Sequence, residues 1–275
     1  MGTLDGKVAF ITGAGRGQGR SHAVRFAREG ADIIAVDTTA PAKSVSYPLA
    51  TAGDLAETAR LVEAEGRRII ARDADVRNYA ALAAAVDEGV KALGRLDIVV
   101  ANAGISAPAP TLAMSEDTWQ EMIDINLTGV WKSLKASVPH IVESGHGGSV
   151  VITSSVAALV VNENIAHYSA AKAGLVSLMK VLAKELAPHS IRVNTVHPGS
   201  VGTDMVYNES TYRLFRPDLE NPGRADFEEV VGKMNRLPVN TLEAEDITDT
   251  VHFLVSDAAK YITGTTHVID AGIAL

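Results

Sequence analysis

The residues best suited to chemistry in this 275-residue sequence are a tyrosine and a lysine four positions apart, Tyr168 and Lys172. The stretch around them is rich in alanine, which favours helix, so the phenol and the ammonium group should share one helical face. A free tyrosine titrates near ~10, and a cation a few ångströms away favours the phenolate and lowers that value. Lowering it to about 7 needs roughly 4 kcal/mol of differential stabilisation. The pair could therefore form a general base, although the same spacing also occurs on ordinary helices.

Two further polar residues could serve the same centre. Ser155 ends a predicted strand thirteen positions before Tyr168. Its hydroxyl could donate to a carbonyl or alkoxide oxygen while the tyrosine exchanges the proton, or it could simply cap a turn. Asn126 falls within a predicted helix, where asparagine is a poor helix former. It either orders Lys172 or a chain of waters, or it is an exposed polar position.

Composition excludes several classes of function. The sequence has 25 basic and 33 acidic residues, so its formal net charge is -8. These charges form no long runs, which disfavours nucleic acid or an anionic membrane as a partner. Without cysteine there is no disulfide, thiolate metal site or cysteine nucleophile, and no His, Asp and Glu set has convincing metal-ligand spacing. The N-terminus has no signal-peptide pattern and no window holds ~20 uninterrupted apolar residues, so we expect a cytoplasmic protein.

Short apolar runs alternate with longer amphipathic stretches along the whole chain, and no linker divides it. This alternation is typical of an α/β fold in which a parallel sheet is covered by helices on both faces. A length of 275 residues with 47% hydrophobic content suits one large domain. We predict strands at residues 8–12, 32–37, 68–73, 98–101, 149–153, 192–196 and 267–269. We predict helices at residues 19–29, 54–65, 80–93, 116–142, 168–187 and 244–255.

A glycine-rich segment follows the first predicted strand and opens directly into a helix. Glycines let the backbone turn sharply and approach a pyrophosphate, while the N–H groups and positive dipole end of the helix receive its charge. An acidic residue closes the second strand about 20 residues later, as in dinucleotide sites. We therefore expect a dinucleotide to bind the residues of this segment: Gly13, Gly15, Arg16, Gly17, Gln18 and Gly19.

The acidic residue, Asp37, indicates which dinucleotide binds. A carboxylate at the end of the second strand accepts hydrogen bonds from the adenine ribose hydroxyls and repels a 2′-phosphate, which favours NAD over NADP. Arg16 argues the other way, because a guanidinium in the glycine segment could pair with that phosphate. Thr38 and Thr39 offer no second cation, so we predict NAD.

Further residues stand where later strands are predicted to end, facing the crevice in which such sheets bind ligands. Asp75 and Val76 follow the third strand and could fix the adenine amino group. Small residues after the fourth strand let the backbone pass close to a cofactor: Asn102, Ala103 and Gly104. The sixth strand is followed by a sharp break at Pro198 and Gly199. Beyond this break, the Val201 backbone and the Thr203 hydroxyl could hold the nicotinamide carboxamide.

Two segments do not fit the alternation. Residues 38–53 contain two prolines and a single charge, and residues 203–238 carry aromatic and methionine side chains scattered among polar residues and prolines. Irregular segments this long are usually lids, binding loops or disordered. The sixteen residues 38–53 could close over a cofactor, and we predict that residues 203–238 form a lid over the substrate. The apolar residues at 157–161 and in the second segment suggest a hydrophobic substrate, although the same residues could instead pack the lid.

Taken together, the glycine segment, the Asn-Ala-Gly at 102–104, Ser155, Tyr168 and Lys172 resemble the short-chain dehydrogenase/reductase family. The likeness covers essentially the whole chain. It implies a single Rossmann-type domain over residues 1–275, with a doubly wound sheet of seven parallel strands, and usually a homotetramer. It also implies that Tyr168 is the acid/base, that Lys172 lowers its pKa and holds the nicotinamide ribose, that Ser155 orients the substrate oxygen and that Asn126 completes a proton relay.

A narrower resemblance is to the mycofactocin-associated, carveol-dehydrogenase-like members of that family. It rests on residues 11–22, on Asp37 with the extra segment that follows it, and on residues 54–58, 66–68 and 75–77. The resemblance implies that the extra segment covers NAD so that it exchanges slowly, and that an external redox partner reoxidises it. Thr38-Thr39 and the sequence His197-Pro198-Gly199 depart from the usual pattern of that group.

We therefore expect an oxidoreductase that moves hydride between NAD and a hydrophobic secondary alcohol or ketone, with Tyr168 exchanging the hydroxyl proton. Two alternatives stay open. One is an NADP-dependent ketone reductase that uses the same residues. The other is a regulatory protein that binds a dinucleotide without turnover, since a fold does not by itself imply a function.

Overall fold

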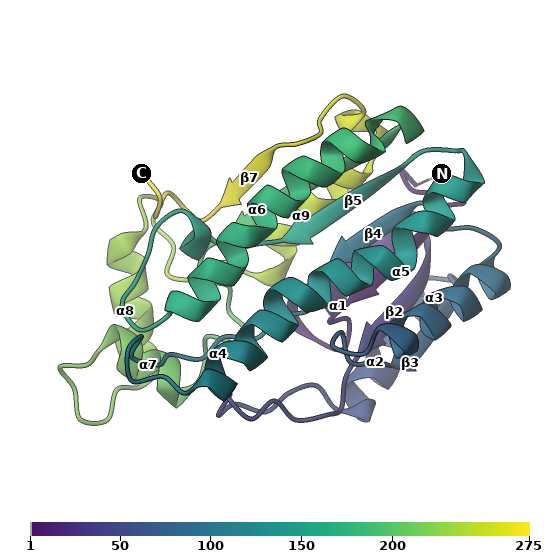
Figure 1. Ribbon diagram of the computed structural model, residues 1–275. Helices are drawn as coiled ribbons and strands as arrows, with labels where there is room; N and C mark the ends of the chain where they lie inside the picture. Colours follow the sequence, from purple (N-terminus) through teal and green to yellow (C-terminus); the bar gives the residue numbers. More distant parts are fainter. Residues whose placement is uncertain (1) are drawn as a thin grey trace.

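All seven predicted strands form, and they lie side by side in one parallel sheet (Figure 1). A computed structural model describes residues 2–275. The strand order across the sheet is β3-β2-β1-β4-β5-β6-β7, and the ends differ from those predicted by at most two residues. The strands are β1 (Val8–Thr12), β2 (Asp32–Asp37), β3 (Ile69–Asp73), β4 (Ile98–Ala101), β5 (Gly148–Thr153), β6 (Ile191–Pro198) and β7 (Thr266–Ile269).

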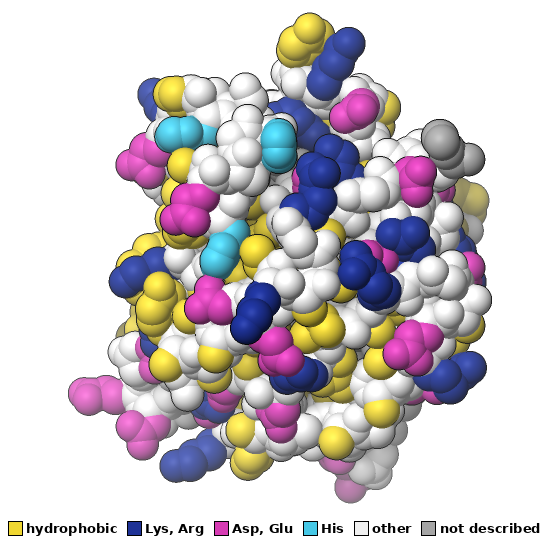
Figure 2. All heavy atoms as spheres, turned by 90° about the vertical axis from the view of Figure 1, so that its right-hand side faces the viewer, with side chains coloured by type: hydrophobic (Ala, Val, Ile, Leu, Met, Phe, Trp, Pro, Cys, Tyr) yellow, Lys and Arg dark blue, Asp and Glu magenta, His cyan; other side chains and the backbone are white. Residues whose placement is uncertain are grey.

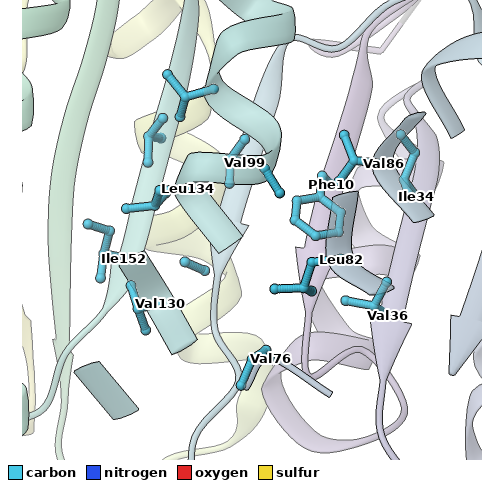
Figure 3. Packing of buried hydrophobic residues seen from close by; sticks show 14 of the residues in the cluster. Phe10, Ile34, Val36, Val76, Leu82, Val86, Val99, Val130, Leu134 and Ile152 are labelled. Atoms are coloured by element: carbon cyan, nitrogen blue, oxygen red, sulfur yellow. The ribbon is translucent and has the colours of Figure 1, made fainter. Parts of the chain in front are cut away.

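Helices cover both faces of the sheet, as the alternating pattern predicts. Successive side chains of a strand point to opposite faces, so Phe10 belongs to one hydrophobic core and Ile11 to the other. The core around Phe10, shown in Figure 3, is closed by α3 (Tyr79–Leu93), α5 (Gly129–Ser144) and α6 (Ala166–Leu186). The core around Ile11 is closed by α1 (Gly17–Arg28), α2 (Ala52–Ala64) and α9 (Ala244–Val255).

The prediction of a single helix at residues 116–142 is wrong in one respect. It begins as α4 (Glu116–Ile123), widens into a π-helical turn over Asp124–Thr128 and continues as α5. Asn126 lies in that turn and is fully buried. This excludes the interpretation of Asn126 as an exposed polar residue. Its Nδ2 donates to the Met122 carbonyl one turn earlier at 3.1 Å, a side-chain bond of the kind that accompanies a local change in helix geometry.

Residues 203–238 are not irregular throughout, contrary to the prediction. They contain α7 (Glu209–Phe215) and α8 (Arg224–Met234). The Asn208 side chain accepts from Thr211 N at 3.0 Å, and the Asp226 carboxylate accepts from Gly223 N at 2.8 Å, so each helix has a capped start. The scattered aromatic residues are explained by a small cluster, in which three rings lie within 6.2 Å of the Phe227 ring centre: Tyr207, Tyr212 and Phe215.

The chain reverses its direction of travel across the sheet between β1 and β4, which are neighbours although β2 and β3 separate them in sequence. Ligands of open α/β sheets bind beyond the carboxyl ends of the strands at such a reversal. In Figure 1 these ends point to the left, where α7 and α8 lie. Asn102 joins the two strand ends, since its backbone N–H donates to Thr12 Oγ1 at 3.0 Å and its Nδ2 to the Thr12 carbonyl at 3.1 Å.

The surface charges are mixed in sign. On the face shown in Figure 2, basic and acidic side chains alternate without a large patch of either. Over residues 2–275, no helix is both long and apolar enough to cross a membrane. Within the same range, no three His, Asp or Glu side chains converge as metal ligands would.

Acid should destabilise this fold through His22 of α1. The ring is fully buried and its Nδ1 lies 2.7 Å from Thr248 Oγ1; burial lowers the pKa to about 3. An unfolded histidine titrates near ~6.5, so as the pH falls from there toward 3 only the unfolded state gains this proton and stability is lost. The expected loss between pH 7 and pH 5 is about 2 kcal/mol from this residue.

Denaturant unfolding of the His22→Gln variant at these two pH values measures the effect. The variant should lose less stability on acidification than the native sequence does, whatever its stability at pH 7. His146, which is exposed, provides the matched control, and His146→Gln should keep the native pH dependence. Identical pH dependence in all three proteins would show that His22 does not titrate on unfolding.

Candidate active site

A cleft of about 490 Å³ lies at the carboxyl ends of the strands. It brings together residues that are far apart in the sequence, and most of the predicted site residues line it. Asn126, Gly15 and Gly19 are the predicted residues that do not. Those on the wall are Gly13, Arg16, Gly17, Gln18, Asp37, Asp75, Val76, Asn102, Ala103, Gly104, Ser155, Tyr168, Lys172, Pro198, Gly199, Val201 and Thr203.

The glycine segment needs glycine at specific points. Gly13 has φ +67°, and a Cβ there would lie 2.9 Å from the Cα of Ala103, so the ends of β1 and β4 could not approach as they do. A Cβ on Gly19 would lie 2.0 Å from the Gly13 carbonyl oxygen. Gly19 therefore lets the first turn of α1 pack directly on the loop that precedes it, although it does not face the cleft.

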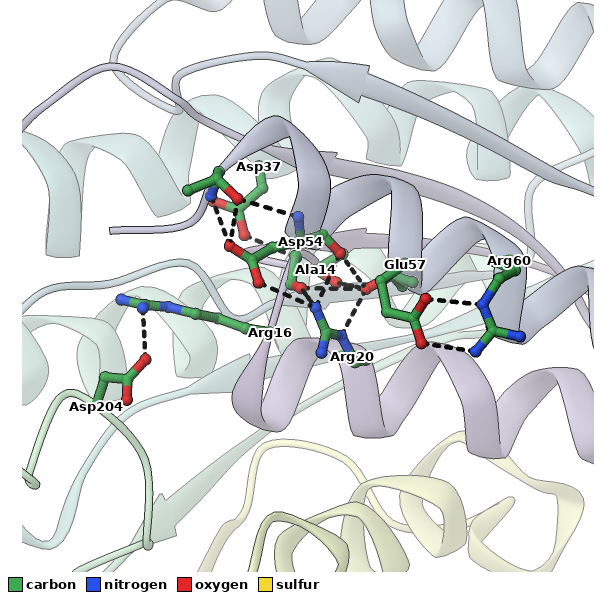
Figure 4. A network of polar contacts seen from close by, with 11 residues as sticks. Ala14, Arg16, Arg20, Asp37, Asp54, Glu57, Arg60 and Asp204 are labelled. Atoms are coloured by element: carbon green, nitrogen blue, oxygen red, sulfur yellow. Dashed lines mark hydrogen bonds and ion pairs between the residues drawn. The ribbon is translucent and has the colours of Figure 1, made fainter. Parts of the chain in front are cut away.

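A network that sequence reasoning missed holds this segment from α2 (Figure 4). The Thr58 hydroxyl, which is fully buried, donates to the Ala14 carbonyl at 2.9 Å and accepts from Arg20 Nε at 3.0 Å. Arg20 also donates to the carbonyls of Gly15 and Asp54. The carbonyl oxygens of the glycine segment are thus fixed by side chains on two helices, and this fixes the orientation of the loop.

Asp37 is held by the backbone around it. Its carboxylate accepts from Gly15 N at 2.7 Å and from Thr38 N at 2.8 Å. Burial raises the pKa of Asp37, and these two backbone bonds only partly oppose that effect. A carboxylate has about four lone-pair sites, so two remain for the hydroxyls of a ligand.

The Arg16 guanidinium is already bonded to other groups of the protein and does not offer a site for a 2′-phosphate. One of its guanidinium nitrogens lies 2.6 Å from the Asp204 carboxylate (Figure 4). The other donates to the Pro48 carbonyl. Arg16 therefore joins the 38–53 segment to the 203–238 segment across the cleft. The choice between the two dinucleotides consequently rests on Asp37, as the sequence suggests.

Asp75 is already partnered. Its carboxylate receives the Arg77 guanidinium at 2.6–3.0 Å, and burial, which raises its pKa, is outweighed by the hydrogen bonds and charge of Arg77, so that the net pKa is lowered. Asp75 and Val76 both line the cleft. An adenine amino group would therefore meet a charged carboxylate that is held in place from the other side.

The predicted reacting pair lies in the cleft on the first turns of α6. Lys172 Nζ donates to the Thr153 carbonyl at 2.9 Å and lies 5.7 Å from the centre of the Tyr168 ring. Burial lowers the pKa of Lys172 to about 8. Burial also raises the pKa of Tyr168, and the nearby Ser155 hydroxyl opposes this rise. In the free protein, the pKa of Tyr168 is therefore raised by the removal of the phenol from water, whereas a neighbouring cation was expected to lower it.

Ser155 caps a turn and also lines the cleft, so the capping role does not exclude the other role considered for it. Its Oγ accepts from Ala157 N at 3.1 Å at the start of a short 3-10 turn. His197, which is fully buried, is bonded through Nδ1 to the Ser155 carbonyl at 2.9 Å and through Nε2 to Thr195 Oγ1 at 3.0 Å. Burial lowers the pKa of His197, so the neutral ring serves as a fixed support between β6 and Ser155.

The Asn126 side chain holds the backbone segment that follows β4. Its side-chain amide accepts from Ile105 N at 3.1 Å and donates to the Ile105 carbonyl at 3.0 Å, which fixes the segment after β4. A Cβ on Gly104 would lie 2.7 Å from Asn126 Oδ1 and 3.4 Å from Lys172 Nζ. The amide oxygen and the ammonium group thus both border the space that a side chain at position 104 would fill, while no hydrogen bond joins them directly.

The 38–53 segment closes one side of the cleft through contacts that the sequence did not reveal. The Glu121 carboxylate of α4 accepts from Lys43 N at 3.1 Å and from Ser44 N at 2.7 Å. Tyr47 accepts from Ser106 N at 3.1 Å and is buried. Ala42, Tyr47, Leu49 and Ala50 line the cleft. The only available signal in the sequence was that this segment contains one aromatic residue.

The other end of the cleft is apolar. The 203–238 segment contributes Met205, Leu214, Phe215 and Met234, whereas Tyr207, Tyr212 and Phe227 pack among themselves and do not line it. Side chains from three further places complete this wall: Ala157, Val160, Ile165 and, near the C-terminus, Ile273. Ile273 was not predicted from the sequence.

Known proteins share this sequence and architecture. The short chain dehydrogenase family matches residues 7–213. The chain is 53% identical to (-)-trans-carveol dehydrogenase from Rhodococcus erythropolis, over 100% of both chains. The crystal structure of carveol dehydrogenase from Mycobacterium avium in complex with NAD has a TM-score of 0.97 and 54% identity, covering 99% of both chains. That of a short chain dehydrogenase from Mycobacterium paratuberculosis bound to NAD has a TM-score of 0.91 and 43% identity, again covering 99% of both. The chain therefore belongs to the short-chain dehydrogenase family.

Proposed function

We propose that this chain is an NAD-dependent dehydrogenase that transfers hydride between nicotinamide and a hydrophobic secondary alcohol or ketone, with Tyr168 as the general acid/base. The observation that carries the proposal is the convergence of Ser155, Tyr168 and Lys172 with the glycine segment in one cleft. The relatives support it, because two similar solved structures contain NAD.

The cleft has the features that NAD requires. A backbone turn without side chains at Gly13 and Gly17 can accept a pyrophosphate at the start of α1. Asp37 offers lone pairs to ribose hydroxyls, and its negative charge would repel the 2′-phosphate of NADP. Lys172 is bonded to Thr153 at the end of β5, and β1 and β4 separate β5 from β2, which ends at Asp37. The nicotinamide half would therefore lie toward Tyr168 and Lys172.

The roles of the side chains follow from these positions. NAD, when bound, supplies the hydride acceptor and a positive charge near Tyr168. The Ser155 hydroxyl donates a hydrogen bond to the substrate oxygen, and Tyr168 Oη takes the proton of that oxygen as the alcohol is oxidised. Lys172 is held by the Thr153 carbonyl and places its ammonium group beside the phenol, where it stabilises the phenolate. Asn126 supports this arrangement through Ile105.

The substrate is inferred to be an alicyclic or terpenoid alcohol. Met205, Leu214, Phe215 and Met234 give the far wall of the cleft an apolar surface, which suits a ligand with one hydroxyl or carbonyl group. The relative named (-)-trans-carveol dehydrogenase supports this substrate class. The alternatives, an NADP-dependent ketone reductase and a non-catalytic dinucleotide-binding protein, are disfavoured by Asp37 and by the complete set of reacting groups.

Further expectations from the sequence and from the resemblance stay predictions. These are the homotetramer, the cytoplasmic location, the slow exchange of NAD under the 38–53 segment and the external redox partner. For the oligomer, exposed apolar side chains on α4, α5 and α6 offer a surface that association would bury: Trp119, Trp131 and Val181.

Formation of NADH from an alicyclic secondary alcohol such as carveol tests the function, together with mass analysis of any nucleotide released from the freshly purified protein. We expect NAD in the released fraction and much slower turnover with NADP. Asp37→Asn removes the negative charge and keeps the shape, so the ratio of kcat/KM for NADP to that for NAD should rise by roughly ten- to a hundredfold. Bound NADP, or an unchanged ratio in the variant, would contradict the role of Asp37.

A further inference from the structure

The 38–53 segment places a second phenol in the cleft that also contains the one proposed as the acid/base. Tyr47 is 6% exposed and lines the same cleft as Arg16 and Tyr168. Its oxygen accepts the Ser106 backbone N–H at 3.1 Å. Among residues 2–275, its own O–H donates no hydrogen bond. Because buried hydroxyl groups normally have their hydrogen-bonding capacity satisfied, this proton is available to a molecule in the cleft.

The surroundings of Tyr47 show which part of a ligand it would meet. The Tyr47 hydroxyl is bonded to Ser106, two residues beyond Gly104, where an added Cβ would lie 3.4 Å from Lys172 Nζ. The next residue, Pro48, is bonded through its carbonyl to Arg16 of the glycine segment. The Tyr47 hydroxyl therefore lies between the two parts of the wall that would hold the pyrophosphate and the nicotinamide. Burial, only partly opposed by the Ser106 N–H, raises the pKa of Tyr47 to about 12. The phenol thus keeps its proton at neutral pH and is a donor rather than a second base.

The position of Tyr47 is fixed before any ligand binds. Residues on both sides of it are tethered to separate elements, with Lys43 and Ser44 bonded to Glu121 of α4, and the Pro48 carbonyl bonded to Arg16. A donor that is already in place loses little conformational freedom on binding, so its hydrogen bond adds more fully to affinity.

We propose that Tyr47 donates a hydrogen bond to an oxygen of the pyrophosphate–nicotinamide ribose half of bound NAD. This inference rests on the proposed function, in which NAD occupies the cleft. It assigns Tyr47 as a contact residue, in addition to any covering role of the segment that contains it.

The test compares three nucleotides by calorimetric or competition titration against the native protein and Tyr47→Phe, which keeps the ring and removes the hydroxyl. NAD and ADP-ribose both contain the pyrophosphate and the second ribose, whereas AMP has neither. We expect NAD and ADP-ribose to bind roughly tenfold more weakly to the variant, as for loss of one hydrogen bond in a charged site, and AMP to bind as before. The exposed Tyr261 supplies the control, and Tyr261→Phe should change none of the three affinities.

Three other outcomes would overturn the assignment, and they differ in meaning. An equal weakening of all three nucleotides in Tyr47→Phe would show that the phenol serves only to hold the segment against Ser106. Unchanged affinity for NAD would show that the phenol makes no contact with the cofactor. Failure of the native protein to bind NAD would overturn the proposed function as well, which the first two outcomes leave intact.

Discussion

Tyr168→Phe should lower kcat for alcohol oxidation by about a thousandfold or more while changing the affinity for NAD by less than about threefold. The ring stays in place and keeps its packing, but the oxygen that takes the substrate proton is lost. Because the removed group acts on the reacting oxygen, the loss falls on kcat rather than on cofactor binding. Initial rates of NADH formation and a separate NAD titration measure the two quantities.

The control for this variant is Tyr212→Phe, which removes a phenol from α7 that lies outside the cleft wall and should leave kcat unchanged. In the native protein, the rate of oxidation should rise with pH, because burial raises the pKa of Tyr168 and the phenolate is the active form. A kcat for Tyr168→Phe within threefold of the native value would remove Tyr168 from the mechanism. So would survival of the native rise with pH in a variant that still turns over.

Gly19→Ala should reduce the affinity for NAD by roughly a hundredfold and destabilise the fold by about 3 kcal/mol. A methyl group at this position would lie 2.0 Å from the Gly13 carbonyl oxygen and 3.0 Å from the Ala14 Cα. These are backbone atoms, so the methyl group cannot be accommodated by rotation of a side chain. The glycine segment must move away from α1, and the cradle for the pyrophosphate moves with it. NAD titration and denaturant unfolding check the two effects.

Gly53→Ala is the matched control, since this glycine lies in the first turn of α2 and the nearest atom to an added methyl is Thr51 Oγ1 at 3.6 Å. Alanine is favoured over glycine in helices by up to ~1 kcal/mol, so the control should be as stable as the native protein or slightly more stable. If Gly19→Ala behaved like this control, the close packing of α1 on the glycine segment would not be required for the site.

The sequence predicted the features that depend on short-range patterns. Alternation of apolar residues indicated the sheet and its two covered faces, because Phe10 and Ile11 must point to opposite sides. Gly13, Asp37 and Tyr168 follow from local motifs, and each lines the cleft as predicted. The capping residues Asn208 and Asp226 also gave a local signal for α7 and α8, but the prolines and scattered aromatic residues nearby obscured it.

The features that the sequence did not reveal depend on contacts between distant segments. Tyr47 reaches the cleft because Glu121 holds the backbone before it and Arg16 the backbone after it, and no periodic pattern encodes those bonds. The effect of burial on Tyr168 was likewise invisible, because the spacing of a tyrosine and a lysine reports their proximity and not their access to water. The π-helical turn at Asn126 has no signal beyond the presence of an asparagine inside a helix.

The strand order has a consequence for biosynthesis. β1 can pair with β2 as soon as residue 37 has been made, but its other edge belongs to β4, which ends at Ala101. While the ribosome adds the intervening residues, the apolar run Val8–Thr12 has one edge without a neighbour, and such an edge can pair with other nascent chains. The β1 side of the proposed nucleotide site can thus form early, whereas the proposed reacting centre must await translation of residues 148–172 and the pairing of β5 with β4.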